Sequence, residues 1–255
     1  MVLAGLFIHI ILDFFARLRL RRSEKLAETA AEKTVQRFNT HYLTQHLLLI
    51  INVLLMVISS IFLWGLRYSG ATWAASLTGA LGGVDFWRLV HRAGALVLIL
   101  TSIYHLIYSL VHPDGRRDFK QMIPTGKDFR DFGQNMLWFI GARPERPQFG
   151  RFSYFEKFDY WAVFWGCAIM IVSGLALWVP EIFRLIIPSA SPAFFEAMKE
   201  AHSHEAMLAV LAIFIWHIYN VHFRPDRFPG TFFWVHGRMS QKEITSEHPL
   251  DLAGQ

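Results

Sequence analysis

Two histidines, His91 and His105, stand at the two ends of the apolar stretch HRAGALVLILTSIYH. Their separation of fourteen positions corresponds, on an α-helix, to a rise of about 21 Å and a return to within about 40° of the starting face. Both imidazoles would therefore point to the same side of one helix, at two depths. Ionisable groups inside apolar segments are rare and usually functional, and neutral imidazole is the commonest metal ligand. A single histidine on an apolar face is more often a hydrogen-bonded core residue than a ligand, but this spacing permits metal ligation at two levels.

A second apolar stretch, AHSHEAMLAVLAIFIWH, repeats this arrangement with His217 at its end and His202 or His204 near its start. His202 lies fifteen positions before His217, about 60° from its face on an α-helix. His204 lies thirteen positions before His217, about 140° from that face. We therefore expect His202 to be a ligand, and His204 to face external water or a partner.

Two helices with histidines at two depths can hold two stacked haems, each iron clamped between imidazoles from facing helices. One iron would lie between His91 and His202. The other would be bound by His217 and by either His105 or His46, which opens another apolar run. Depth alone permits both of these partners, so the sequence predicts two haem b groups with His46 and His105 competing for the second.

Other metal chemistries fit the sequence less well. The single cysteine, Cys167, lies inside an apolar run, which excludes disulfides, Cys-rich zinc sites, thiolate-bound iron–sulfur clusters and C-x-x-C-H haem attachment. A zinc or di-iron site needs three or four donors that converge at one depth, and the apolar segments supply single pairs of imidazoles. Haem is therefore the favoured cofactor.

The elements that would position these histidines are membrane helices. Of the 255 residues, 53% are hydrophobic and only 18% are charged, which is typical of a membrane protein. A transmembrane helix needs about 20 largely apolar residues. Four stretches qualify, and the sequence therefore predicts an all-α integral membrane protein whose core, residues 46–222, is a four-transmembrane-helix bundle that binds haem. The predicted spans are 46–66, 86–111, 158–180 and 201–222.

The remaining segments flank this core. Residues 1–22 form a further N-terminal apolar helix, which is expected to insert partly or to pack on a partner. Residues 23–45 are a basic linker and residues 223–255 a tail. Basic residues are concentrated in the segment before the first span, in the 112–157 loop and in the tail, whereas the other two loops hold three in all. The positive-inside rule then predicts that both ends of the core are cytoplasmic. The net charge of +5 reflects this topology, and nucleic-acid binding is not expected.

Four phrases together resemble the cytochrome b (gamma) subunit family of membrane-bound formate dehydrogenases, which includes related hydrogenase and thiosulfate reductase subunits. They are RFNTHYLTQH, LVHRAGA, RFSYFEKFDYWAVFWG and HSHEAMLAVLAIFIWHIYNVHF, within residues 37–240. The resemblance implies a four-helix bundle with two b-type haems, ligated by His46 with His217 and by His91 with His202. His105 departs from the family pattern, and it leaves open a swapped ligand or a third haem.

The resemblance also implies a quinone site beside the inner haem, formed by polar residues just before the third span. Here these residues are Tyr154, Glu156 and Lys157; the formate enzymes of the family carry an Asn-x-Gly-Gln phrase, and only the lysine is plainly kept. Glu156 or Lys157 could exchange protons with a quinone, although the same residues also suit an interfacial anchor. The 112–157 loop is too long for a simple connector, and we expect it to cover this site or dock a cytoplasmic neighbour.

The function predicted from the sequence is that of a di-haem membrane subunit in the bacterial inner membrane. It would transfer electrons between the quinone pool and a periplasmic redox partner, namely a catalytic, multihaem or iron–sulfur subunit. No catalytic residue and no substrate site of its own is predicted. One alternative is a haem-free membrane anchor or assembly subunit. Another is a proton or metal transporter, which would require carboxylates at mid-bilayer depth, whereas Glu205 is expected near the outer rim.

Overall fold

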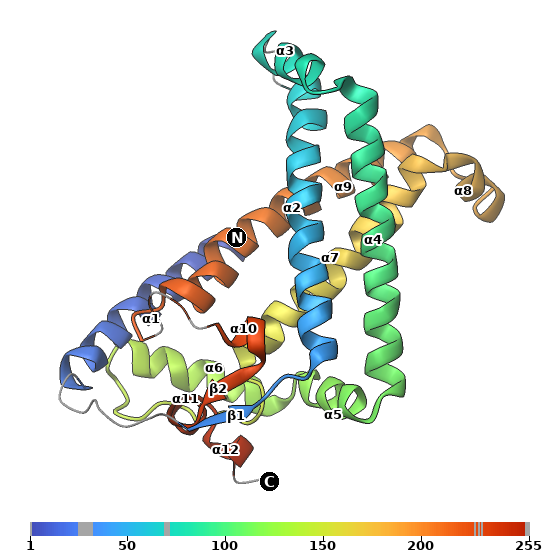
Figure 1. Cartoon of the computed structure of the whole chain (residues 1–255). Helices are drawn as coiled ribbons and strands as arrows, with labels where there is room; N and C mark the ends of the chain where they lie inside the picture. The colour runs from blue at the N-terminus through green and yellow to red at the C-terminus, as the bar shows by residue number, and fades with distance from the viewer. Residues whose placement is uncertain are drawn as a thin grey trace. The chain divides into compact units, whose positions relative to one another are not determined.

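The computed structural model describes residues 2–24, 33–68, 72–226, 228, 230 and 232–252. Four of its helices are long and apolar enough to cross a membrane, over Thr40–Trp64, Gly83–Val111, Tyr154–Trp178 and Pro192–Phe223. They belong to α2 (Thr40–Tyr68), α4 (Gly83–Val111), α7 (Tyr154–Trp178), and α9 (Pro192–Ala212) continued by η1 (Ile213–His217) and η2 (Tyr219–Phe223), as Figure 1 shows. The prediction of an all-α membrane protein with four spans is confirmed.

The fourth span differs from its predicted bounds. It begins at Pro192 instead of residue 201, because the preceding segment PAFFEAMKE is also helical. It also contains two π-helical segments, η1 and η2, after Ala212.

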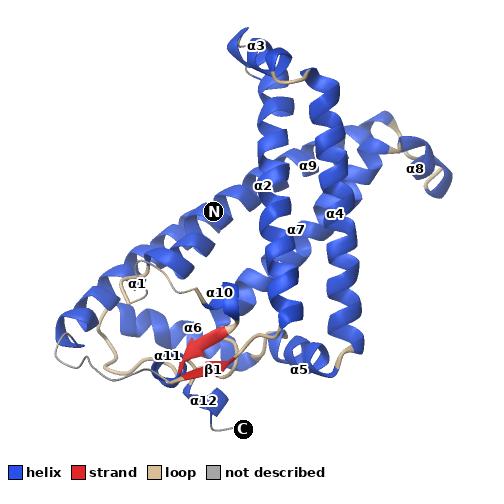
Figure 2. Cartoon of the chain, in the orientation of Figure 1, coloured by secondary structure: helices blue, strands red, loops and turns tan. Residues whose placement is uncertain are grey.

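Shorter elements connect and flank the spans (Figure 2). They are α1 (Val2–Glu24), α3 (Thr72–Ala80), α5 (Pro113–Met122), α6 (Gly126–Phe139), α8 (Pro180–Ile186), α10 (Phe233–His236), α11 (Gln241–Glu247) and α12 (Pro249–Leu252). Two short strands, β1 (Thr34–Gln36) and β2 (Arg238–Ser240), pair antiparallel with Val35 opposite Met239. The predicted basic linker and the predicted tail therefore meet in one small sheet.

The chain divides into two compact units. The first unit comprises residues 1–43, 113–165 and 207–255, and the second comprises residues 44–112 and 166–206. The first unit thus holds α1, α5, α6, the small sheet, the beginning of α7 and the end of the fourth span. The second unit holds α2, α4, the rest of α7 and the beginning of α9.

In the second unit, α2 and α4 approach closely at Gly94. The side-chain amide of Asn52 donates a hydrogen bond of 2.7 Å to the carbonyl oxygen of Gly94. A Cβ atom at position 94 would lie only 2.6 Å from the sulfur of Met56. Small residues commonly allow this kind of contact between membrane helices. Gly94 therefore serves helix packing.

In the first unit, α1 packs against α6 and η1, and its polarity is inverted relative to a helix in water. The side chains that it buries include His9, Asp13 and Arg17, whereas Phe7 and Phe15 are among its exposed residues. A helix with polar side chains facing the protein and apolar side chains facing outward is suited to contact with lipid. The expected N-terminal apolar helix is therefore present, and it packs on other parts of its own chain.

A buried ion cluster fixes α1 to the C-terminal part of the chain. Arg17 bonds Asp13 at 2.8 Å, Asp226 at 2.5 Å and Glu247 at 3.1 Å. Arg224 bonds Asp226 at 2.8 Å and Glu247 at 2.7 Å. Burial alone would lower the pKa of Arg17, but the surrounding carboxylates raise it above its usual value. The carboxylates also outweigh burial at Arg224, whose pKa is well above the usual value. Each of these two cations thus has one acid partner nearby in the sequence and at least one, Glu247, from another element.

Candidate haem-ligand site

His91 of α4 and His202 of α9 face each other in the second unit. Their ring centroids are 6.2 Å apart, and the ring planes are inclined by 71°. Nδ1 of His91 lies 2.9 Å from the hydroxyl of Ser59 on α2, and Nδ1 of His202 lies 3.0 Å from the hydroxyl of Ser173 on α7. All four membrane helices therefore contribute one side chain to a single site.

The separation of the two rings fits a shared iron. A metal–imidazole bond is about 2.0 Å long, and the ligating nitrogen of a five-membered ring with bonds of about 1.35 Å lies about 1.2 Å from the centroid. Two imidazoles on opposite sides of one metal ion should then have centroids about 6.4 Å apart. The observed 6.2 Å agrees with this value. The distance between the rings is thus compatible with a haem iron that both imidazoles would hold.

The serine contacts occupy one nitrogen of each ring. The hydroxyl of Ser59 can donate to the carbonyl oxygen of Met56 at 3.1 Å, and that of Ser173 can donate to the carbonyl oxygen of Ile169 at 2.6 Å. When a hydroxyl gives its single proton to that carbonyl, its oxygen accepts a hydrogen bond from Nδ1–H of the imidazole. Nε2 then carries the lone pair that a metal ligand requires. In this arrangement both rings would bind a metal through Nε2.

Gly174 of α7 makes room for the ring of His202. A Cβ atom at position 174 would lie 3.1 Å from Cε1 of that ring, closer than an ordinary van der Waals contact. Sequence reasoning did not identify Ser59, Ser173 or Gly174. A signal was present for the two serines, since they are polar residues within apolar spans and their side chains are completely or almost completely buried. Their partners depend on tertiary packing.

In the first unit, the imidazole of His217 bonds a carboxylate instead of a serine hydroxyl. Its Nδ1 lies 2.6 Å from Oδ2 of Asp159, in the second turn of α7. Carboxylates commonly orient metal-binding imidazoles in this way and increase their basicity. His217 is the last residue of η1, and π-helical turns occur frequently at functional sites. Sequence reasoning missed Asp159, although an acid at the start of a predicted span was a signal.

The two competing histidines, His46 and His105, both belong to the second unit. Nδ1 of His105 lies 2.8 Å from Oε1 of Gln45, and its Nε2 lies 3.4 Å from the hydroxyl of Ser109. Both ring nitrogens of His105 thus have polar neighbours within their own unit. His46 lies in the second turn of α2. The choice between the two residues stays a prediction.

His204, the residue that helical phase disfavoured as a ligand, is exposed, and its Nδ1 bonds the carbonyl oxygen of Glu200.

The predicted quinone residues lie together at the beginning of α7, and each has a partner in the protein. The hydroxyl of Tyr154 accepts a hydrogen bond of 2.8 Å from Asn135. Glu156 accepts hydrogen bonds from the backbone and the hydroxyl of Ser153, at 2.8 and 2.6 Å. This arrangement is the capping box of a helix N-terminus. Sequence reasoning overlooked the S-x-x-E pattern that predicts it.

Lys157 forms an ion pair with Asp128 at 2.9 Å. Burial would raise the pKa of Asp128, but hydrogen bonds from Lys157 and Thr125 lower it below the usual value. Lys157 also donates to the carbonyl oxygen of Ile123 at 3.4 Å. This part of the 112–157 loop therefore packs on the start of α7, beside the predicted quinone residues. Quinone binding at these residues stays a prediction.

His9 of α1 is a titratable residue that sequence reasoning did not single out. Its Nε2 lies 2.7 Å from the hydroxyl of Tyr154, and its ring packs against Phe139 and Trp216. Burial lowers the pKa of His9 to about 4, and its Nδ1 makes no hydrogen bond with the described residues. His9 is therefore neutral near pH 7.

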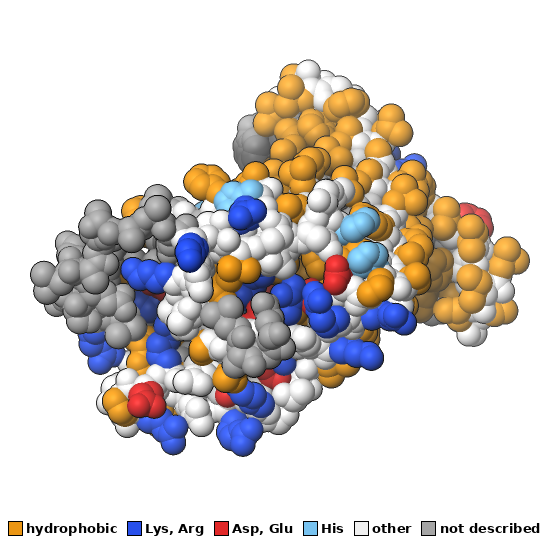
Figure 3. All heavy atoms as spheres, turned by 60° about the horizontal axis from the view of Figure 1, so that its bottom comes forward, with side chains coloured by type: hydrophobic (Ala, Val, Ile, Leu, Met, Phe, Trp, Pro, Cys, Tyr) orange, Lys and Arg blue, Asp and Glu red, His pale blue; other side chains and the backbone are white. Residues whose placement is uncertain are grey.

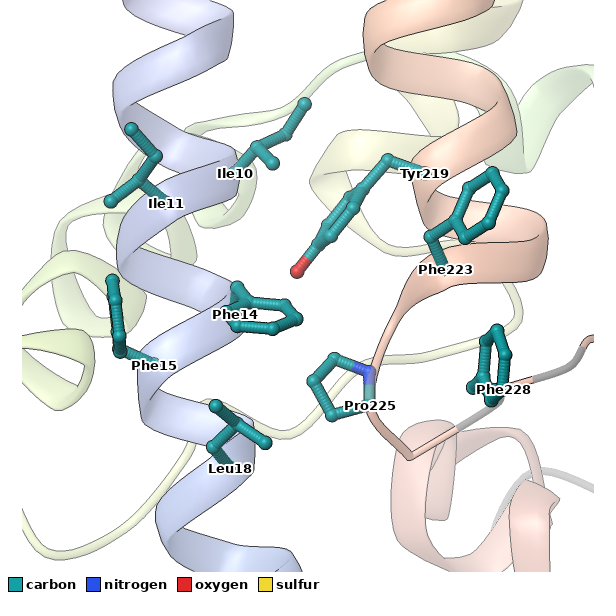
Figure 4. A pocket seen from close by; sticks show the side chains of 9 residues that line it. All are labelled: Ile10, Ile11, Phe14, Phe15, Leu18, Tyr219, Phe223, Pro225 and Phe228. Carbon is teal, nitrogen blue, oxygen red and sulfur yellow. The ribbon is translucent and has the colours of Figure 1, made fainter.

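An apolar groove lies beside this cluster, between α1 and η2 (Figure 4). It encloses about 490 Å³ and is lined in part by Ile10, Phe14, Leu18 and Phe223. Tyr219, whose hydroxyl donates to Asp13 at 2.9 Å, also lines it. The groove is suited to an apolar chain, and none of the three predicted quinone residues lines it.

The carboxyl group of Glu205 lies nearer the middle of the membrane-spanning helices than expected. Its Oε1 atom lies 2.9 Å from the position that a Cβ atom of Gly166 would occupy. Gly166 is the middle residue of α7 (Tyr154–Trp178), so the carboxyl group is level with the centre of that span. The expectation that Glu205 lies near the outer rim was wrong, because the fourth span begins nine residues earlier than predicted.

The sequence matches no family model and no curated protein. Among the residues that the structure describes, no group of three or more His, Cys, Asp or Glu side chains could hold a metal ion. The candidate ligands therefore rest on the paired histidines and their hydrogen-bond partners.

Proposed function

We propose that this chain is a di-haem b-type cytochrome subunit that carries electrons across a membrane, between the quinone pool and a redox partner on the opposite side. The observation that carries the proposal is the pair formed by His91 and His202. Their centroid separation of 6.2 Å suits a shared iron, and the serine at Nδ1 of each ring suits ligation through Nε2.

The bound haem would supply one-electron chemistry, and the protein would position it. His91 and His202 would hold its iron, while Ser59 and Ser173 restrain the rotation of their rings. Because the serines are neutral, they hold the rings without adding charge to the interior of the membrane. Neutral partners suit this position, because charged side chains are energetically unfavourable inside a membrane.

His217, which Asp159 orients through Nδ1, would hold a second haem. We infer that His46 is the other ligand, as the family resemblance implies. Hydrogen bonding does not decide the choice, because Nδ1 of His105 bonds Gln45 at 2.8 Å, a support of the kind that the other candidate ligands have. A neutral serine supports each ligand of the first haem and a carboxylate supports His217, so we expect the two haems to differ in reduction potential.

The remaining parts of the proposal rest on the sequence. Basic residues place both ends of the core on the cytoplasmic side, and the resemblance implies quinone near Tyr154, Glu156 and Lys157. The partner would be a catalytic, multihaem or iron–sulfur subunit in a bacterial inner membrane, and it would perform the chemistry of the complex. A haem-free anchor is the alternative, and it predicts a colourless protein.

The decisive measurement is the haem content of the purified chain, determined as the pyridine haemochrome together with a reduced-minus-oxidised spectrum. Two haems per chain are expected. Replacement of His91 or His202 by Ala should each remove one haem, whereas His204→Ala, a matched change on the same helix, should remove none. Absence of haem from protein produced with sufficient haem supply would support the anchor alternative.

The second ligand can be assigned with two further variants. If His46 binds the second iron, His46→Ala loses one haem and His105→Ala retains both. The reverse result would assign His105, and three haems in the unchanged chain would give both residues a role.

One observation favours a second candidate function, proton transport. Glu205 places a carboxyl group level with the middle of a span, where ionisable residues commonly mark proton paths. A transporter would contain no haem, and it would lose proton flux into liposomes on Glu205→Gln. The haem count therefore separates the two candidates before any flux is measured.

A further inference from the structure

Helix α5 lies where a lipid headgroup would meet the protein. The second span ends at Val111, which has an exposed apolar side chain, and α5 begins two residues later at Pro113. At its other end, the carbonyl oxygen of Met122 accepts a hydrogen bond of 2.9 Å from the indole of Trp161, and Phe119 packs against the same indole. Trp161 belongs to the membrane-spanning part of α7. Helix α5 is therefore held at the edge of the membrane.

The charged residues that line a hollow on α5 are all positive. Arg116, Arg117 and Lys120 surround a hollow of about 520 Å³, together with Pro113 and Gln121. Figure 3 shows Lys and Arg side chains gathered on the face that carries α5 and α6. The spacing of these cations on the helix places them on one side, within one turn of each other.

The acidic residues of α5 do not neutralise the hollow. Asp118 is buried and bonds Arg151 at 2.8 Å and Arg117 at 3.1 Å. Asp114 is 3.3 Å from Arg117. Arg116 and Lys120, by contrast, are exposed and form no ion pair with a described residue. Two cations thus remain available to an anion at the mouth of the hollow.

We propose that this hollow binds the phosphate of an anionic phospholipid such as phosphatidylglycerol. Arg and Lys are the residues that recognise phosphate, and basic pockets at the cytoplasmic edge of membrane helices bind anionic headgroups. The occupant is a lipid because an exposed apolar residue precedes the hollow and another, Ile123, follows α5, so acyl chains can continue along the protein from the phosphate. The inference does not depend on haem binding.

The test uses the full chain, purified and stripped of lipid, with native mass spectrometry to count bound phosphatidylglycerol or phosphatidylcholine. The unchanged protein should bind one phosphatidylglycerol more tightly than phosphatidylcholine. The double variant R116Q/K120Q should bind that lipid about thirtyfold more weakly, since each basic group near an anionic surface contributes about fivefold. The charge-conserving variant R116K/K120R should retain most of the affinity.

A matched control removes two other exposed cations, Arg143 and Lys242, in the variant R143Q/K242Q. It should change the affinity less than about threefold, because these residues lie outside the hollow. Equal binding of both lipids by the unchanged protein would overturn the proposal. So would unchanged phosphatidylglycerol binding in R116Q/K120Q, which would assign the cations to another occupant such as an acidic protein, or an equal loss in the control.

Discussion

Gly174 provides a direct test of the axial role of His202. A Cβ atom at this position would lie 3.1 Å from the imidazole, whereas ordinary contacts begin at 3.4 Å. In Gly174→Ala the ring must therefore retreat by about 0.3 Å, which exceeds the tolerance of about 0.2 Å for metal–ligand distances. We expect weaker retention of one haem, about 10–100-fold, and complete loss of that haem in Gly174→Leu. The assay is the pyridine haemochrome per chain, with the absorption spectrum as a second readout.

The direction of this effect is informative because Gly→Ala in a helix interior normally stabilises the protein, by about 0.5–1 kcal/mol. A general folding defect is therefore not expected in Gly174→Ala. The control is Gly79→Ala in α3, where a new Cβ atom would have no neighbour within 4 Å; it should leave both haems in place. Two haems and an unshifted spectrum in Gly174→Leu would refute the role of His202 as a ligand held against α7.

Three further predictions concern the serine partners of His91 and His202, the carboxylate partner of His217, and the buried His9. Ser59→Ala and Ser173→Ala should each weaken retention of the same haem about 10–100-fold, measured as haem loss to apomyoglobin. Asp159→Asn should affect the other haem and change its midpoint potential in a redox titration, because a neutral amide replaces a carboxylate. The pKa of His9 falls from 6.5 to about 4 on burial, so its contribution of about 3 kcal/mol is present above pH 6.5 and lost as the pH falls toward 4. Denaturation at several pH values should show this loss, and His9→Phe should remove it.

Hydropathy and helical phase predicted a substantial part of the fold and the site. Each of the four spans was located to within about nine residues at its start. Phase favoured His202 over His204, and the structure brings the ring of His202 to His91 while leaving His204 exposed. These features follow from local periodicity, which a single sequence contains.

Features that depend on neighbouring helices were not predictable in the same way. Ser59 and Ser173 are distant in sequence from the histidines that they orient. The depth of Glu205 was misjudged because the charged segment before it continues a helix. The phase calculation for His217 assumed a regular α-helix, but η1 and η2 have wider turns, in which each residue advances by a smaller angle.

The buried ion cluster has a consequence for biosynthesis. Arg17 is translated more than 200 residues before two of its three carboxylate partners, Asp226 and Glu247. Segments that are made first generally fold first during synthesis, but α1 cannot complete these ion pairs until Glu247 has been made. Until then, Asp13 is the only one of the three carboxylates available to Arg17. The cluster thus couples the final packing of α1 to synthesis of the segment that holds Asp226 and Glu247.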